Sequence, residues 1–306
     1  MYRSSISSSE HMGHSGDLRW LVRCASAALL ALLVCAIAAL RLGGGLELPA
    51  TTTRDSALLA LNRYLREPIP DVVLVGSSLT FRLSEEYFET PRLRNLALAG
   101  GSPLTGLEIV AHQSQLPKII LVETNVLSRP ADDVLVEKYT RKQQVESLFL
   151  RPLRFGVASY ENWMHKPASH SKMADALNRL IMQAPSDFDN RTYMERAVSQ
   201  LDALDPSPAV RMSVEIVRGL IPELEERGAK VFLFELPYID QVEKTRAATI
   251  TREIVHAAFP ESSRWLPVDV ARSDLRWADG VHLDERSALI TARSIEKIFA
   301  VRSHGG

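Results

Sequence analysis

The chain has 306 residues, 46% of them hydrophobic, and its 36 basic and 37 acidic side chains leave a formal net charge of −1. This length suffices for one large α/β domain or two small ones, and the balanced charge predicts no nucleic-acid partner. Both cysteines, Cys24 and Cys35, lie in one apolar run near the N-terminus, so the rest of the chain can hold neither a disulfide framework nor a cysteine-based zinc site.

The apolar run extends from Trp20 to Leu40 and carries Arg23 as its only charge. Because about 20 apolar residues span a bilayer as a helix, residues 20–40 predict one membrane anchor, with residues 1–19 as a short cytoplasmic tail. Since that tail is too small to be a domain, we expect the remainder of the chain on the other side of the membrane. The small residues at Ala36 and Ala38 leave a cleaved signal peptide as the alternative.

Residues 41–55 are rich in glycine, threonine and proline and are expected to form a linker, so that one domain occupies residues 56–306. Strands and helices are predicted to alternate there, which indicates an α/β fold with a doubly wound, flavodoxin-like parallel sheet of about five strands and flanking helices. Strand-like runs come at Val72–Val75, around Leu96, from Lys118, from Lys230 and, more weakly, up to Val270, and helical spacing begins at Pro103, Ala209 and Glu285.

Residues 141–206 interrupt this alternation. We expect helices and loops there, inserted between the third and fourth strands. The segment is polar but holds aromatic side chains, among them Phe155, Tyr160, Trp163 and Tyr193. Two interpretations stand: the segment packs against the core, or it forms a lid or substrate-binding cap.

Gly76, Ser77 and Ser78 directly follow the first predicted strand. A serine at this point can cap the next helix by accepting a hydrogen bond from a backbone N–H. Alternatively, one of the two serines is a nucleophile, because ligands of doubly wound sheets bind at the carboxyl ends of the strands.

A second reactive pattern lies between the last predicted strand and the last predicted helix, where Asp279 precedes His282 by three positions. In a single turn the carboxylate can hold the imidazole Nδ1–H, and the other ring nitrogen is then free to take a proton from a serine. This spacing is common by chance. Here, however, it falls on the same edge of the predicted sheet as Ser78.

Four other histidines give no sign of a metal site. His112, His165, His170 and His256 have no acidic or cysteine partner at ligand spacing. Neither a metal nor a cofactor is therefore expected.

Two stretches of the sequence resemble the first two motif blocks of the SGNH/GDSL hydrolase superfamily. The sequence GSSLT is similar to the family's first block, with Ser78 at the nucleophile position and Ser77 where the family often has aspartate. The sequence NLALAGGS, which begins at Asn95, is similar to the second block. It places Gly100 at the position of the family's glycine whose N–H binds the oxyanion, although Ala97 replaces the usual first glycine. Without the resemblance, Gly100 would be interpreted equally well as a turn glycine.

The third and fourth blocks extend the resemblance. In LVETN, Asn125 falls on the family's oxyanion asparagine, although Glu123 and Thr124 depart from the usual G-x-N-D pattern, and a helix N-cap is the alternative for Asn125. Asp279 and His282 match the final D-x-x-H. The four blocks keep the family's order, and the resemblance implies Ser78, Asp279 and His282 as the catalytic residues.

The resemblance implies a serine-dependent acyl-ester hydrolase or O-acetyltransferase. With one N-terminal span, the chain looks like bacterial envelope proteins that add or remove acetyl groups on exopolysaccharides. An inner-membrane location with the catalytic domain in the periplasm, an acylated polysaccharide substrate and a separate membrane acyl-donor protein are then expected. Two alternatives stay open, namely an esterase of lipids or small esters and a non-catalytic polysaccharide-assembly or polysaccharide-binding protein.

Overall fold

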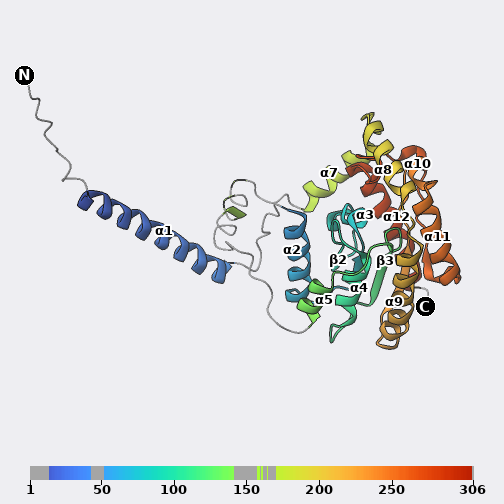
Figure 1. Ribbon diagram of the computed structural model, residues 1–306, viewed down its shortest axis with the longest axis horizontal. Coiled ribbons are helices and arrows are strands. Elements are labelled where there is room, and N and C mark those ends of the chain that lie inside the picture. The colour runs from blue at the N-terminus through green and yellow to red at the C-terminus, as the bar shows by residue number, and fades with distance from the viewer. Residues whose placement is uncertain are drawn as a thin grey trace, which may run out of the picture. The chain divides into compact units, whose positions relative to one another are not determined.

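The structure, a computed structural model, describes residues 14–42, 52–140, 157–158, 160, 164 and 170–304. Contacts separate the chain into two units, one that includes residues 1–49 and 147–167 and one that comprises residues 50–146 and 168–306. Helix α1 belongs to the first unit and the other helices and strands named below belong to the second (Figure 1). The two units are described separately.

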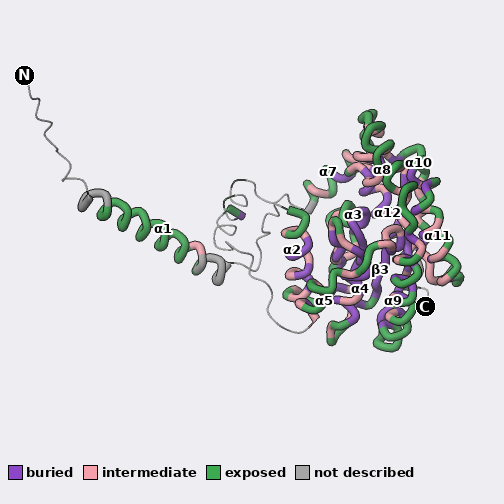
Figure 2. The backbone as a smooth tube through the Cα atoms, viewed as in Figure 1, coloured by how far each residue is buried: buried purple, intermediate pink, exposed green. Residues whose placement is uncertain are grey.

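Helix α1, His14–Leu42, contains the predicted membrane anchor. Its segment Leu18–Cys35 is long and apolar enough to cross a membrane, a property that it would share with a signal sequence near an N-terminus. Large apolar side chains along this segment, such as Trp20 and Leu29, are exposed. Figure 2 accordingly shows most of the described length of α1 in the colour of exposed residues. The helix is therefore compatible with the single span that the sequence predicts.

The second unit is built on a five-stranded sheet whose strands run parallel in the order β2-β1-β3-β4-β5. Every residue of β1 and β3 is buried, because inner strands of a parallel sheet are covered on both faces. The α/β class and the parallel sheet that the sequence predicts are thus confirmed. The strands are β1 (Val72–Val75), β2 (Leu93–Asn95), β3 (Ile119–Glu123), β4 (Lys230–Phe234) and β5 (Trp265–Leu266).

Helices surround this sheet and supply its connections. The α-helices are α2 (Thr53–Arg66), α3 (Ser78–Phe81), α4 (Pro103–Ala111), α5 (Asp133–Thr140), α7 (His170–Met182), α8 (Arg191–Ala203), α9 (Ser207–Glu226), α10 (Asp240–Glu243), α11 (Arg246–Ala258) and α12 (Glu285–His304). Single 3-10 turns are η1 (Glu85–Tyr87), η2 (Ser262–Arg264) and η3 (Arg272–Asp274).

Both faces of the sheet are covered, because successive side chains of a strand point to opposite faces. On one face Val75 lies against Gly106 of α4, and α9 and α11 continue this layer. On the other face Leu74 joins Leu289 and Ala292 of α12 in one buried cluster. The two layers leave the carboxyl ends of the strands as the edge at which a ligand can bind.

Three element boundaries differ from those that the sequence indicates. Helix α2 begins at Thr53, inside the expected linker 41–55, because the Thr52 hydroxyl accepts the N–H of Asp55 at 3.1 Å and caps the helix. Strand β2 ends just before Leu96. Strand β5 ends at Leu266 instead of Val270, since the next residue is a proline, which has no N–H to donate to a neighbouring strand.

Helices α7 and α8 of the insertion are described, and they belong to the second unit. Leu177 of α7 is buried in the same cluster as α12, so this part packs against the core, as one of the two interpretations predicts. Helix α8 has no buried residue, and its Tyr193 is exposed. Tyr160 is also exposed, whereas Phe155 and Trp163 lie outside the described residues. The lid stays a prediction.

Candidate active site

The two serines after β1 have different roles. Ser77 Oγ accepts the N–H of Leu79 at 3.2 Å and so caps the short helix α3. Ser78 is the first residue of α3, and its hydroxyl is hydrogen-bonded to His282. The helix-cap interpretation is therefore confirmed for Ser77. The nucleophile interpretation stays a prediction, and the hydrogen bond to His282 favours Ser78 for that role.

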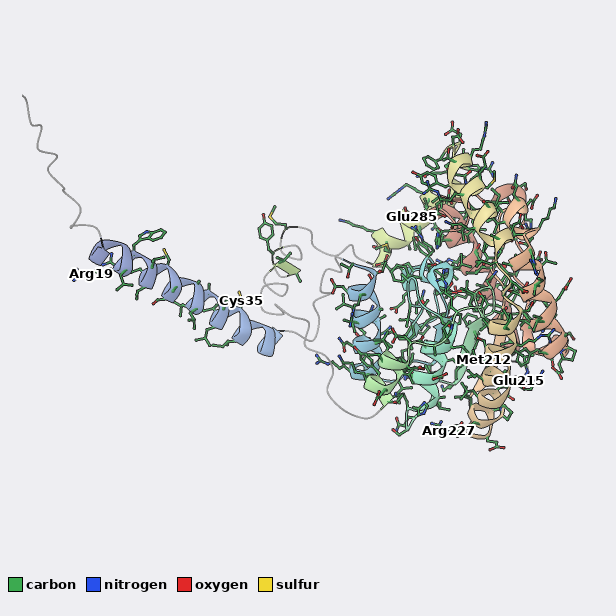
Figure 3. The ribbon with its side chains drawn as sticks, in the orientation of Figure 1. Arg19, Cys35, Met212, Glu215, Arg227 and Glu285 are labelled. Atoms are coloured by element: carbon green, nitrogen blue, oxygen red, sulfur yellow. The ribbon has the colours of Figure 1, made fainter. Side chains whose placement is uncertain are left out.

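Ser78, His282 and Asp279 form a continuous hydrogen-bonded chain. Ser78 Oγ lies 2.8 Å from His282 Nε2, and His282 Nδ1 lies 2.7 Å from Asp279 Oδ2. These groups come from distant parts of the sequence, because Ser78 follows β1 whereas the other two precede α12. Figure 3 labels Glu285, the first residue of α12. An imidazole held in this way can withdraw a proton from a serine hydroxyl.

The environment of Asp279 favours its ionised form. Burial raises the pKa of the Asp279 carboxyl, but hydrogen bonds from the ring and backbone of His282, and the positive charge of that ring when it is protonated, outweigh burial and hold the pKa well below its usual range. Asp279 Oδ1 also accepts the backbone N–H groups of His282 at 2.8 Å and Val281 at 3.2 Å. A carboxylate here keeps the imidazole proton on Nδ1, which leaves Nε2 able to accept the serine proton.

The turn formed by residues 279–282, here called the Asp–His turn, packs directly against helix α8. Gly280 has a φ of 81°, in the left-handed region that favours glycine, and a Cβ at this position would come within 2.6 Å of Met194 Cα. Just before α8, Asn190 Nδ2 donates to the carbonyl oxygen of Trp277 at 2.5 Å. The insertion therefore supports the turn that carries the imidazole.

The N–H groups of Ser78 and Gly100 are the two backbone donors that the sequence predicts for an oxyanion. The chain after β2 runs beside the end of β1, where the N–H of Leu98 donates to the carbonyl oxygen of Gly76 at 3.0 Å. Gly100 follows Leu98 by two residues, as Ser78 follows Gly76, and Gly100 has a φ of 78°. Within the described part of the chain, the N–H groups of Gly100 and Ser78 donate to no other residue, so both suit the predicted oxyanion site.

Asn125 makes a contact that the sequence does not indicate. Its Nδ2 donates to the Leu236 carbonyl oxygen at 2.9 Å, and its Oδ1 accepts the Leu236 N–H at 2.7 Å. The side chain thereby ties the end of β3 to the end of β4, and the alternative of a helix N-cap is wrong, since the next helix begins at Asp133. The role of Asn125 as an oxyanion donor stays a prediction that depends on the second Nδ2 hydrogen.

Glu123 borders the site, although the sequence does not single it out as a site residue. It is the last residue of β3, and its exposed fraction is 0%. Its carboxylate accepts hydrogen bonds from Ser77 and Thr80, on either side of Ser78. The signal in the sequence is an acidic residue at the end of an apolar strand, because a buried carboxylate must be paired.

A hollow of about 300 Å³ opens next to the Asp–His turn. Phe188 and Asn190 of the insertion line it on one side, and Arg276 and Trp277, which precede the turn, line it on another. The described part of the insertion therefore borders this hollow together with residues that lead into the turn, whereas neither Ser78 nor residues 279–282 line it.

Two further histidines, His112 and His256, make contacts away from this site. His112 Nδ1 lies 2.7 Å from the carbonyl oxygen of Glu108, and the His256 ring stacks on Trp265 with 4.0 Å between ring centroids. His165 is not among the described residues. Across the described ranges, no three His, Cys, Asp or Glu side chains form a group that could hold a metal ion.

No protein-family model matches the chain, and no curated protein matches it either. The functional assignment therefore rests on the fold and on the geometry of the site. These define an α/β protein with a parallel five-stranded sheet and a Ser–His–Asp chain that begins just after the first strand.

Proposed function

We propose that the protein is a serine-dependent acyl-ester hydrolase or O-acyltransferase. The observation that carries this proposal is the chain from Ser78 Oγ through His282 to Asp279, with hydrogen bonds of 2.8 Å and 2.7 Å. A serine hydroxyl is a weak nucleophile until a neighbouring base removes its proton. The hydrogen bond to Nε2 places such a base on Ser78.

The first half of the reaction acylates the serine. As Ser78 Oγ attacks the carbonyl carbon of the ester, its proton passes to His282 Nε2 and the carbonyl oxygen becomes an oxyanion. The N–H groups of Ser78 and Gly100 stabilise this negative charge, with Asn125 as a third donor. His282 then gives the proton to the leaving alkoxide, which departs as an alcohol and leaves the acyl group on Ser78. Asp279 remains ionised and stabilises the imidazolium.

The second half of the reaction releases the acyl group. An acceptor hydroxyl attacks the acyl carbonyl while His282 takes its proton, and the same proton returns to Ser78 Oγ when the acyl–oxygen bond breaks. Water as the acceptor gives hydrolysis, and a sugar hydroxyl gives acyl transfer. The steps in both halves need neither a metal nor a nucleotide.

The proposal includes membership of the SGNH/GDSL hydrolase superfamily. Its support is the position of each predicted block, since Ser78 follows β1, Gly100 follows β2, Asn125 follows β3, and the Asp–His turn precedes the final helix. Helix α1, which is long and apolar enough to span a membrane, supports a membrane-anchored protein. The proposed location is the inner membrane, with the second unit in the periplasm. The proposed substrate is an acylated envelope or extracellular polysaccharide, and the proposed partner of a transferase is a membrane acyl-donor protein.

An esterase of lipids or small esters would use the same residues, so only substrates can separate it from the proposed enzyme. A non-catalytic assembly or binding protein, in contrast, does not require a histidine that is hydrogen-bonded to a serine hydroxyl. The Ser78–His282 hydrogen bond of 2.8 Å therefore favours an enzyme over the binding role.

The test uses the full chain purified in detergent and p-nitrophenyl esters of acetate and of longer acids. We expect turnover of the acetate ester, a loss of about 10³-fold or more in Ser78→Ala and His282→Ala, and labelling of Ser78 by a serine-directed phosphonate. Activity retained in Ser78→Ala would refute the nucleophile. A wild-type protein that neither turns over an ester nor labels would favour the binding role, and a preference for long acyl chains would favour a lipid esterase.

A further inference from the structure

Glu123 brings a carboxyl group to residues 76–80, here called the nucleophile turn, which include Ser78. Strand β3 pairs with β1 so that Val122 lies opposite Val75, and the next residue along β3 therefore comes beside Gly76. Burial raises the pKa of the Glu123 carboxyl, and hydrogen bonds from Thr80 and Ser77 oppose that rise. Because the side chain is completely buried, this carboxyl can be satisfied only by protein groups.

Four donors from the nucleophile turn converge on this carboxylate. Glu123 Oε2 accepts the N–H of Ser77 at 2.8 Å, the hydroxyl of Thr80 at 2.7 Å and the N–H of Thr80 at 3.3 Å. Glu123 Oε1 accepts the hydroxyl of Ser77 at 2.8 Å. Ser77 precedes Ser78 and Thr80 follows it within the same short helix, so the carboxylate holds the nucleophile turn on both sides of the nucleophile. Fully satisfied buried networks of this kind make a structure rigid.

Gly76 is fitted to the same contact. A Cβ at this position would come within 2.4 Å of Thr80 Oγ1 and within 2.7 Å of Glu123 Oε2. Only glycine fits at position 76, because the Glu123 carboxyl and the Thr80 hydroxyl occupy the place that a side chain would need.

The two ends of α3 are held by different residues. Asn95 Nδ2 donates to the carbonyl oxygens of Thr80 at 2.8 Å and Leu83 at 2.7 Å, so Asn95 secures the end of the helix. Glu123 binds N–H and hydroxyl groups of Ser77 and Thr80, and Ser78 presents its hydroxyl and its N–H between them. Of these two contacts, the one with Glu123 lies nearer to the reacting atoms.

We propose that Glu123 is a positioning residue for the nucleophile, an inference that rests on the proposed function. Its carboxylate fixes the backbone on both sides of Ser78, so that Oγ points to His282 while the N–H of Ser78 faces the oxyanion. Glu123 acts through Ser77 and Thr80. Because a misplacement of about 1 Å in an active site can lower the rate about 10²-fold, the effect should appear in the chemical step.

The test substitutes Glu123→Gln, which keeps the shape of the side chain but turns an N–H₂ group toward donors. Active sites are counted in each sample by phosphonate titration, so that misfolded protein does not contribute to kcat. We expect kcat per site to fall about 10- to 100-fold, with KM within about twofold of the wild-type value and a parallel fall in the rate of phosphonate labelling. If Glu123 had only a structural role, Glu123→Gln would lower the number of active sites per sample and leave kcat per site unchanged.

Glu296 offers a matched control. From α12 it accepts the N–H of Glu89 at 2.9 Å, the N–H of Thr90 at 2.6 Å and the Thr90 hydroxyl at 2.7 Å. These are the same kinds of donor, but they belong to the loop between η1 and β2 and not to the nucleophile turn. Glu296→Gln is therefore expected to lower thermal stability and to leave kcat per site within about twofold of the wild-type value.

If Glu123→Gln does not fold, Thr80→Val tests the same contact by removing one donor from a residue of similar shape, and a several-fold fall in kcat per site is expected. If the wild-type protein is active and Glu123→Gln has the same kcat per site, the positioning role alone is overturned. Where Glu123→Gln does not fold, the same conclusion follows from an unchanged kcat per site in Thr80→Val. A wild-type protein that neither turns over an ester nor labels would overturn the proposed function, and this inference with it.

Discussion

Asp279 binds both the ring and the backbone of His282. Its Oδ2 lies 2.7 Å from Nδ1, and its Oδ1 accepts the backbone N–H at 2.8 Å. One carboxylate therefore shapes the turn and orients the imidazole within it. Substitutions that separate these two roles give a direct test of the proposed mechanism.

We expect Asp279→Asn to lower kcat about 10³- to 10⁴-fold with the fold intact. The asparagine can keep the backbone contact through Oδ1, but its amide can donate to Nδ1, which favours the tautomer with the proton on Nε2, where it blocks the base. Asp279→Ala should be as inactive and should also melt at a lower temperature, because the turn loses its cap. Ester turnover and thermal unfolding measure the two effects. An asparagine variant within tenfold of wild type would contradict the role of Asp279.

The stability of the protein should depend on pH through the same carboxyl. The pKa of Asp279 is lower in the folded protein than its ordinary value of 3.8. A carboxyl shifted in this direction stabilises the folded state above the unfolded pKa, and the contribution is lost as the pH falls toward the folded pKa. The difference in free energy of unfolding between wild type and Asp279→Asn should therefore be smaller at pH 3 than at pH 5, as measured by urea denaturation. An equal difference at the two pH values would argue against an ionised, stabilising Asp279.

The parts of the site that could be predicted from the sequence are those whose contacts are local or follow from topology. Asp279 and His282 are three residues apart, so one turn brings them together. The contact between Ser78 and His282 spans 204 residues, but parallel strands end at one edge of the sheet, and both residues follow strand ends. The strand Val72–Val75 was recognisable because a continuous β-branched run is typical of a strand buried on both faces.

The parts that could not be predicted depend on register and on side-chain packing. Nothing in the sequence says that Asn125 would use its amide on Leu236, since this requires β3 and β4 to end side by side. The hydrogen bonds of Glu123 likewise require β3 to lie next to β1 in one register. The contact between the insertion and the Asp–His turn joins segments that share no sequence pattern.

That last contact predicts a specific effect of Gly280→Ala. A methyl group at a φ of 81° and within 2.6 Å of Met194 Cα strains the turn and displaces either the turn or α8. We expect the free energy of unfolding to fall by about 1–3 kcal/mol and kcat to fall with it, because the imidazole moves away from Ser78. Urea denaturation and ester turnover measure the two losses.

Gly219→Ala is the matched control for that substitution. Gly219 lies inside α9, and nothing occupies the space within 4 Å of its missing Cβ. Since alanine is favoured over glycine inside a helix, the free energy of unfolding should rise by about 0.5–1 kcal/mol, with kcat unchanged. A Gly280→Ala variant as stable as the wild type would show that the turn does not pack against α8.

The membrane anchor predicts how the full chain fractionates. Leu29 and Leu33 lie on either side of the centre of the apolar run 20–40, with 68% and 55% of their surface exposed. Each aspartate in the centre of a membrane helix costs about 2.5–3.5 kcal/mol, so Leu29→Asp combined with Leu33→Asp should release the protein from membranes washed with alkaline carbonate. The wild-type chain should stay in the pellet with its mass unchanged. As a control, Val134→Asp with Met212→Asp changes two exposed apolar residues of the second unit and should leave the protein in the pellet. Soluble wild-type protein cleaved after Ala38 would instead identify α1 as a signal peptide.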